Sequence, residues 1–367
     1  MTAAEFEAAG LYDPRAPHSA DRLAFLEWLV GQGATMAQIV AAHRGGALAE
    51  LASDLKLRPG PRLNAREVAR RNGLTVEQVL ALSLAVGLPP RDADDPIYGE
   101  DDSITFESFA VASGLFGAPA TRRFVRVIGS SLARIAEAAV SLFQVNVEGP
   151  LRASGGTDLD VAKENMRAIA TLGQVRQMLQ VLFTGHMERA IRLLRDARPR
   201  RSVDTATLAV GFVDLVGFTT LSHRMSPQEL AQVIERFEET AYDVATAREG
   251  RVVKLIGDEV MFVTVDPAAA CDIALTLFER FADDVAVTPR GGLAFGELLM
   301  RGGDYYGPVV NLAARVAQIA VPNELLATTE MAAAVASAPL RLEPAGKRML
   351  KGFDGPVALA SVSRKSS

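Results

Sequence analysis

The chain has 367 residues, a length that suggests two domains and leaves room for a third. Hydrophobic residues make up 49% of it, enough for sizeable cores, and the net charge of −5 does not demand a nucleic-acid partner. The single cysteine, Cys271, cannot form an intrachain disulfide, as expected in a reducing compartment. The N-terminus lacks the features of a secretory signal, and no segment approaches about 18 uninterrupted apolar residues. We therefore expect a cytoplasmic protein without a transmembrane segment.

Helical periodicity dominates the first half of the chain. Apolar residues recur at helical spacing in 21–31, 36–43, 64–73 and 75–87, and glycine turns followed by threonine caps, such as Thr35, separate these segments. The sequence therefore predicts an all-α region built from short helix pairs.

The pair at 64–87 has the layout of a helix-turn-helix. A DNA-reading helix presents polar and basic residues to the base edges, whereas TVEQVLALSLAVG at 75–87 is largely apolar. We therefore favour a structural helical unit. The DNA-binding alternative depends on four nearby positive charges: Arg62, Arg66, Arg70 and Arg71.

An acidic segment at 92–103 predicts a loop, and long amphipathic helices follow at 122–147 and 158–194. The Gly/Pro-containing stretch EGPLRASGGTD, at 148–158, predicts the turn between them. The basic stretch RLLRDARPRR then marks a domain boundary. We expect a helical regulatory domain over 1–198, with 158–200 as its transmission helix and linker.

Beyond residue 205 the periodicity changes to that of an α+β domain. The apolar run at 207–213 is typical of a strand covered on both faces, and Ser226, Pro227 and Glu229 form the start of a capped helix. Further strands are predicted at 251–256, 259–265 and 290–296, helices at 267–283 and 308–319, and short strands near 324–328, 347–350 and 357–362. The order β-α-β-β-α-β predicts a ferredoxin-like domain over 205–363.

Two aspartates, Asp214 and Asp258, each follow a short apolar strand at a tight turn. A carboxylate at the end of a buried strand needs a cation or hydrogen bonds to compensate it. Taken singly, each is most simply a turn former or helix cap, and Gly257-Asp258 is an ordinary hairpin turn. Taken together, the pair indicates a shared divalent metal site for phosphoryl chemistry.

Residues 205–363 resemble the catalytic domain of class III nucleotide cyclases, because several separated motifs appear in the family's order. These motifs are FVDLVGFT at 212–219, KLIGDEVMF at 254–262, DYYGPVVNLAAR at 304–315 and LKGFDGPVAL at 350–359. The resemblance implies an adenylate cyclase that converts ATP to 3′,5′-cyclic AMP and pyrophosphate.

The same resemblance assigns roles to individual residues. Asp214 and Asp258 would hold two Mg²⁺ or Mn²⁺ ions per site. Lys254 and Asp304 would recognise the purine. Lysine is a donor and aspartate an acceptor, which suits adenine, with its acceptor at N1 and its donor at N6. Guanine has a donor at N1 and an acceptor at O6 and would need the opposite pair. ATP is therefore the expected substrate.

The remaining assignments concern the phosphates and the transition state. The turn that contains Phe218 and Thr219 would cradle phosphate oxygens through backbone N–H groups, and Lys351 is a further phosphate candidate. Asn311 and Arg315 lie four residues apart, so they share one helix face, where they would orient the ribose and stabilise the transferring phosphate.

In this family the sites form between two subunits, so the resemblance implies a homodimer with two composite sites. The first half resembles, more loosely, the regulatory domains of actinobacterial cyclases, some of which respond to pH. His186, in the helix that leads to the catalytic domain, is a candidate because histidine titrates near neutral pH. A lipid in the helical domain is another possible effector.

Three alternatives stay open on sequence alone. The first is a guanylate cyclase or a cyclase of relaxed specificity. The second is a diguanylate cyclase. The segment IGDEV at 256–260 resembles the GGDEF signature of those enzymes but lacks its glycine pair. The third is a nucleotide-sensing DNA-binding regulator with a cyclase-like domain, which the intact metal and transition-state residues disfavour.

Overall fold

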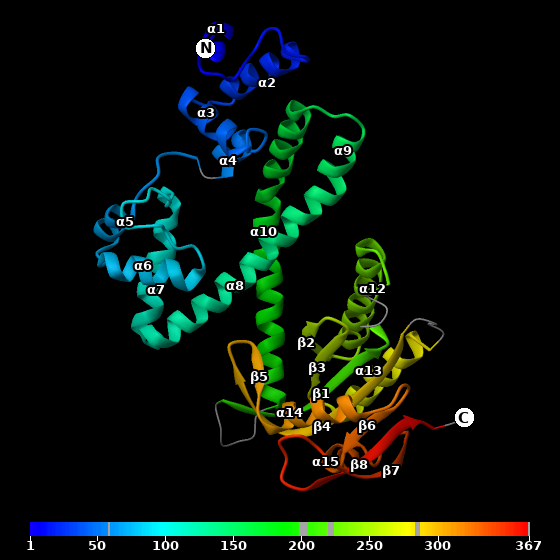
Figure 1. Ribbon diagram of the computed structural model, residues 1–367. Coiled ribbons are helices and arrows are strands. Elements are labelled where there is room, and N and C mark those ends of the chain that lie inside the picture. The colour runs from blue at the N-terminus through cyan, green and yellow to red at the C-terminus, as the bar shows by residue number, and fades with distance from the viewer. Residues whose placement is uncertain (58, 198–203, 219–223, 283–286, 366–367) are drawn as a thin grey trace. The chain divides into compact units, whose positions relative to one another are not determined.

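The computed structural model describes residues 1–57, 59–197, 204–218, 224–282 and 287–365. Its internal contacts divide the chain into two compact units, residues 1–183 and 184–367. The long helix α10 (Asp158–Ala197) begins in the first unit and ends in the second (Figure 1). No helix in the described ranges is both long and apolar enough to cross a bilayer.

The N-terminal part of the first unit is helical, as predicted. The predicted cap at Thr35 is confirmed, since its hydroxyl and the Gln38 side chain form a capping box. Phe25, Leu26 and Leu29 are buried in a core that includes residues from the start of α10. The helices of this part are α1 (Ala3–Ala8), α2 (Ser19–Gly31), α3 (Met36–Gly45) and α4 (Leu51–Leu57).

The segment with helix-turn-helix layout forms α5 (Ala65–Asn72) and α6 (Val76–Val86), which pack on α7 (Ser103–Phe116). The acidic stretch before α7 is largely a loop, as predicted, and ends in a 3₁₀ turn, η1 (Glu100–Asp102). The loop and the 3₁₀ turn pair with neighbouring arginines, since Arg66 forms an ion pair with Asp94 and Arg71 forms one with Glu100.

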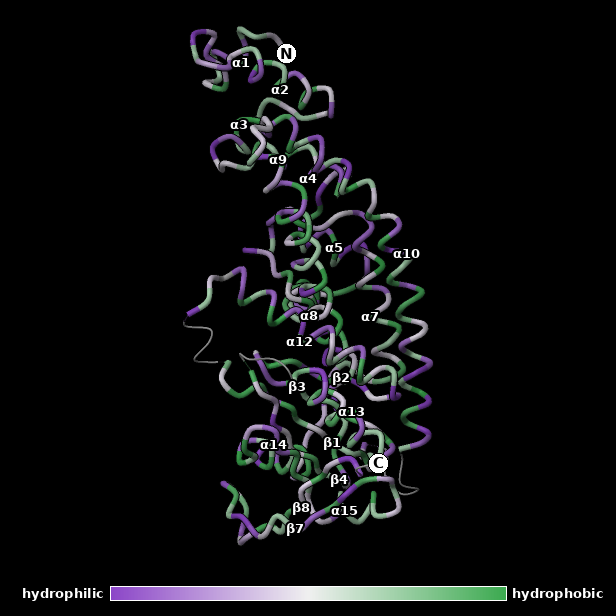
Figure 2. Tube along the Cα trace, turned by 90° about the vertical axis from the view of Figure 1, so that its right-hand side faces the viewer, coloured by the Kyte–Doolittle hydropathy of each residue, from purple (hydrophilic) through white to green (hydrophobic). Residues whose placement is uncertain are grey.

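The two predicted long helices are present as α8 (Ala118–Phe143) and α10. The predicted turn at 148–158 is wrong in its first half, because Gln144–Glu148 forms a π-helical turn (η2) and Gly149–Ala153 a short helix, α9. Proline and glycine are tolerated in the first turn of a helix, so the chain reverses only after Ala153. Figure 2 shows hydrophobic and hydrophilic residues alternating along α10.

The second unit is built on one mixed sheet with the order β2-β3-β1-β4-β6-β8-β7, and β5 pairs with β4. The first four strands of that order are antiparallel, as the ferredoxin-like prediction requires, and β6 joins β4 in parallel. The strands are β1 (Thr205–Val216), β2 (Arg251–Ile256), β3 (Glu259–Thr264), β4 (Thr288–Arg301), β5 (Asp304–Tyr306), β6 (Leu325–Thr328), β7 (Leu340–Met349) and β8 (Pro356–Arg364).

Helices cover both faces of this sheet (Figure 1). Because side chains alternate along a strand, Val213 and Leu215 of β1 pack towards α12 (Pro227–Thr246) and α13 (Pro267–Arg280). Val210 and Phe212 point to the opposite face, which α14 covers. We call this second face the α14 face. The helices α14 (Pro308–Ile319) and α15 (Thr329–Ala334) complete the unit.

Candidate active site

Asp214 lies near the end of β1 on the α14 face, opposite Glu259 of β3 and Arg290 of β4. Its side chain is only 17% exposed. Nε and Nη2 of Arg290 both donate to Oδ2 of Asp214, at 2.8 and 2.6 Å. A guanidinium therefore compensates this buried carboxylate. No motif in the sequence singles out Arg290; the register of β1 against β4 places it opposite Asp214.

Asp258 follows Gly257, whose φ of +64° suits the tight turn between β2 and β3. Burial raises the pKa of the Asp258 carboxyl, and its nearness to Asp214 raises it further. Burial also raises the pKa of Glu259 to about 7, with the charges of Asp214 and Asp258 acting in the same direction. The structure thus brings the two predicted aspartates together and adds a third carboxyl beside them.

These carboxyls fit a divalent cation. Within the described ranges, no group of three or more His, Cys, Asp or Glu side chains is arranged to hold a metal ion by itself. Two carboxylates suffice for Mg²⁺ when phosphate oxygens of a nucleotide provide further ligands. Burial, and after it the nearness of Asp214, raise the pKa of Asp258, and a bound cation would oppose both effects.

The two predicted base-reading residues form an ion pair. Nζ of Lys254, on β2, donates to Oδ2 of Asp304, on β5, at 2.6 Å. Burial works against the charge of Asp304, but hydrogen bonds from Lys254 and from the Tyr305 backbone N–H hold the pKa of Asp304 below its usual value. Both side chains stay partly exposed, at 39% and 30%, so a ligand can reach them.

Asn311 and Arg315 lie one turn apart on α14, as predicted. Asn311 is exposed and Arg315 half-buried. Nη1 of Arg315 donates to the Gln318 side chain at 2.6 Å, and the Gln318 backbone carbonyl accepts from Nη1 of Arg290 at 3.1 Å. Gln318 therefore connects the predicted transition-state arginine to the arginine that holds Asp214.

Of the remaining candidates, Phe218 and Lys351 lie within the described residues. Gly217, with φ of +97°, makes the turn after β1. The Phe218 side chain is buried in the core below α12, so only its backbone can serve a phosphate. Thr219 lies outside the described residues. Lys351 is exposed in the turn between β7 and β8.

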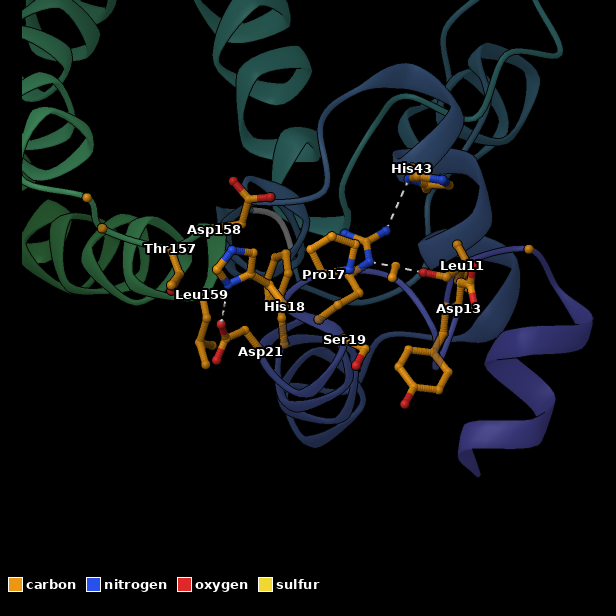
Figure 3. Close-up of a pocket in the computed structure, with 17 residues that line it drawn as sticks. Leu11, Asp13, Pro17, His18, Ser19, Asp21, His43, Thr157, Asp158 and Leu159 are labelled. Atoms are coloured by element: carbon orange, nitrogen blue, oxygen red, sulfur yellow. Dashed lines mark hydrogen bonds and ion pairs between the residues drawn. The ribbon is translucent and has the colours of Figure 1, made fainter.

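A separate cavity of about 760 Å³ lies in the first unit, between α2, α3 and the start of α10 (Figure 3). Nε of Arg22 donates to the Leu11 carbonyl at 3.0 Å, and Nη2 lies 3.2 Å from Nδ1 of His43. Burial lowers the pKa of Arg22, although the charge of Asp158 opposes the shift. Arginine offers no acceptor, so Nδ1 of His43 must accept this bond.

Comparisons with known proteins match both parts of the chain to cyclase families. The sequence model of the family "Adenylate cyclase regulatory domain" matches residues 7–191, and that of "Adenylate and Guanylate cyclase catalytic domain" matches 201–360. An adenylate cyclase of Streptomyces coelicolor is 32% identical over 88% of this chain and 79% of its own length. A pH-sensitive adenylate cyclase of Mycobacterium tuberculosis is 31% identical over 94% of this chain and 88% of its own length.

Among solved structures, the adenylyl cyclase CyaB from P. aeruginosa is similar, with 22% identity and a TM-score of 0.41. That match covers 45% of this chain and 98% of the other.

The fold and the motif residues define a class III nucleotide cyclase domain preceded by a helical regulatory region. The chain belongs to the class III adenylate cyclases that carry an N-terminal adenylate cyclase regulatory domain. It is an enzyme, an adenylate cyclase, and domains of this class generally use divalent metal ions.

Proposed function

We propose that this adenylate cyclase converts ATP to 3′,5′-cyclic AMP and pyrophosphate in composite sites of a homodimer, and prefers ATP to GTP. The observation that carries the substrate choice is the ion pair of Lys254 and Asp304. Its ammonium can donate to N1 of adenine, and its carboxylate can accept from the 6-amino group. Guanine presents a donor and an acceptor in the opposite places, so this pair would oppose it.

Asp214 and Asp258 would hold the divalent ions of the reaction. Bound there, two cations would lower the pKa of the ribose 3′-hydroxyl and neutralise the triphosphate. The protein's own part is to keep two carboxylates close together at a strand end. Arg290 holds one of them in place through two hydrogen bonds to a single oxygen.

Asn311 would orient the ribose, and Arg315 would stabilise the charge that builds on the α-phosphate. Phosphate oxygens would lie against the backbone N–H groups that follow β1, at Gly217 and Phe218, with Lys351 near the terminal phosphates. In the composite site, the aspartates come from one subunit and Lys254, Asp304, Asn311 and Arg315 from the other.

Exposed apolar residues support association of two copies. On α8, Phe124, Ile128, Leu132 and Ile135 recur at helical spacing and are each at least 40% exposed. An apolar stripe of this kind usually marks an interaction surface.

The substrate proposal is tested by assaying the purified full-length protein with ATP and with GTP, each with Mg²⁺ and Mn²⁺. We expect cyclic AMP as the main product and a higher kcat/KM for ATP. Equal or better use of GTP would show that Lys254 and Asp304 do not select adenine.

The DNA-binding alternative has less support. Arg66 and Arg71, two of the four charges on which it depends, are used in ion pairs with the acidic loop. Binding of the purified protein to DNA at moderate salt would support the DNA-binding alternative.

We further propose that residues 1–198 regulate the catalytic domain, 205–363, through α10. In the second unit, the Arg189 side chain of α10 donates to the Gly250 carbonyl, next to β2. Ala197 of α10 is buried on the α14 face. A movement of α10 would thus reach the strand that carries Lys254.

Protons are the proposed signal, because one relative is pH-sensitive. His186 is exposed on α10, and His43 accepts a bond from Arg22 in the first unit. Protonation of His43 would remove that acceptor and place a second positive charge beside Arg22. The cavity around Arg22 also has apolar walls, such as Leu11 and Phe25, and would suit a lipid with an anionic head.

Deleting residues 1–200 and assaying the remainder across pH tests the regulatory role. We expect a changed specific activity and a flatter pH profile than in the full-length protein. Identical activity and profile in both proteins would exclude regulation by the first domain.

A further inference from the structure

Arg251, the first residue of β2, reaches across to the hairpin formed by β4 and β5. Its Nη2 donates to the Gly303 carbonyl at 2.9 Å, and Nη1 donates to the Tyr305 hydroxyl at 3.2 Å. Its guanidinium carbon also lies 5.6 Å from the centre of the Tyr305 ring. The two residues that Arg251 holds are the immediate neighbours of Asp304.

A β-bulge in β2 puts Arg251 and Lys254 on one face of the sheet. Arg251 pairs with Val263 and Lys254 with Met261, and the register shifts between them. In a regular strand, residues three apart point to opposite faces. The extra residue, Val253, restores Lys254 to the α14 face, where Val263 and Met261 also pack.

The hairpin that carries Asp304 pairs over only three residues. It turns through Gly302 and Gly303, both with positive φ, and β5 is only three residues long. Glycines of this kind give a tight turn but little stiffness. Tyr305, by contrast, is only 3% exposed, so its ring fixes one side of the hairpin.

We propose that Arg251 is a positioning residue that sets Asp304 against Lys254 and thereby determines the preference for ATP over GTP. The inference rests on the proposed purine-reading role of that pair. Arg251 would touch neither the nucleotide nor the metal. One of its hydrogen bonds holds the Gly303 backbone and the other holds the Tyr305 side chain, so both neighbours of Asp304 are tied to β2. Base recognition tolerates only small displacements of such groups.

The contacts of Asp304 explain why another residue must fix the position of its carboxylate. Oδ2 accepts from Lys254 and Oδ1 from the Tyr305 N–H, at 2.6 and 2.8 Å. Each oxygen keeps one further lone pair for a base amino group. If the hairpin shifted, the Lys254 ammonium would follow the carboxylate, and the pair would survive without facing adenine correctly.

The test compares kcat/KM for ATP and for GTP in Arg251→Met, which keeps the aliphatic stem and removes the guanidinium. We expect the ratio of kcat/KM for ATP to kcat/KM for GTP to fall about tenfold, which is the effect of losing one charge-assisted hydrogen bond. The fall should come mainly from a higher KM for ATP. Arg251→Lys should restore part of the ratio. Arg301→Met is the matched control, since Arg301 is exposed on the same hairpin, and its ratio should match that of the wild type.

An unchanged ratio in folded Arg251→Met, or an equal fall for both nucleotides, would overturn the inference. If Arg251→Met does not fold, Tyr305→Phe provides the test, because it removes only the hydroxyl. We expect about a threefold fall in the ratio there, and an unchanged ratio would again reject the inference. Asp304→Asn tests the purine-reading role separately from the role of Arg251. If this change leaves the ratio unchanged, the proposed reading pair of Lys254 and Asp304 is itself wrong.

Discussion

At the scale of single residues, the chemistry of the site depends on how charge is compensated at the end of β1. Arg290 neutralises Asp214 directly, whereas the pKa of Asp258 is raised by burial and by Asp214. The charge of Arg290 lowers the pKa of Asp258 only as the smallest of the influences on it. A divalent cation shared by the two carboxylates would supply the missing positive charge.

Asp214→Asn and Asp258→Asn should each reduce kcat by about a thousandfold or more, because each removes a metal ligand while keeping the side-chain shape. Cyclase assays with Mg²⁺ and titration calorimetry with Mn²⁺ would measure both consequences. Asp243→Asn, an exposed position on α12, is the control. Normal Mn²⁺ affinity in both variants would contradict the metal assignment.

Arg315→Ala should lower kcat by roughly a hundredfold or more and change KM for ATP little, because its partner charge develops only in the transition state. Steady-state kinetics separates the two constants. Gln318→Ala serves as the comparison, since it removes the bond that Arg315 makes within its own chain. An equal loss in Gln318→Ala would indicate that Arg315 acts by holding α14 in place.

At the scale of elements, α14 packs closely against β4, and Gly292 permits this approach. A Cβ at Gly292 would lie 2.2 Å from the Ala317 nitrogen and 2.5 Å from the Ala313 carbonyl oxygen. Backbone atoms of a packed helix cannot yield as a flexible side chain does. The position of Asn311 and Arg315 over the sheet therefore depends on a glycine in a neighbouring strand.

Gly292→Ala should destabilise the protein by about 1–3 kcal/mol through overpacking, and should also lower kcat by displacing α14. Thermal unfolding and cyclase assays would show the two effects together. Gly185→Ala, at an open position within α10, should be neutral or slightly stabilising. A Gly292→Ala protein with an unchanged melting temperature would show that α14 can shift without cost.

The elements that the sequence predicted well are those with local signals. Threonine caps at Thr35 and Thr75 and the capping box that begins at Ser226 were predicted from the sequence, and the helices that they begin are present. The motif residues of the proposed site also have local signals: Asp214 and Asp258 lie near or next to strand ends, and Asn311 and Arg315 share one helix face. Their roles stay predictions. Their pairing in space, Lys254 with Asp304, followed from the family resemblance.

What the sequence did not reveal depends on contacts between distant segments. The predicted strand at 347–350 is in fact part of Leu340–Met349, because β7 is an edge strand and tolerates Pro344 and a register shift. The three-residue β5 and the bulge in β2 exist only through pairing with neighbours. The same holds for Arg290, which is unremarkable until β4 lies beside β1.

At the scale of the whole molecule, one chain carries both halves of the proposed site. Asp214 and Asp258 form one contact group, and Lys254 with Asp304 forms another, each held by its own partners. If the halves meet only across a two-fold axis, each dimer has two sites and each site uses two chains. Regulation would then act on the relation between subunits rather than on any single residue.

Co-expressing Asp214→Ala and Arg315→Ala chains should recover about a quarter of wild-type activity, because about half of the dimers are mixed and each keeps one intact site of two. Differently tagged chains and purification of the mixed dimer allow the activity per site to be measured. Asp214→Ala with Asp258→Ala is the matched control, since both changes lie in the same half and every site in the mixed dimer stays broken. Recovery in the first pair alone would require the aspartates and Arg315 of one site to come from different chains; no recovery in either pair would place all of them in one chain, and the dimer would then not be needed for chemistry.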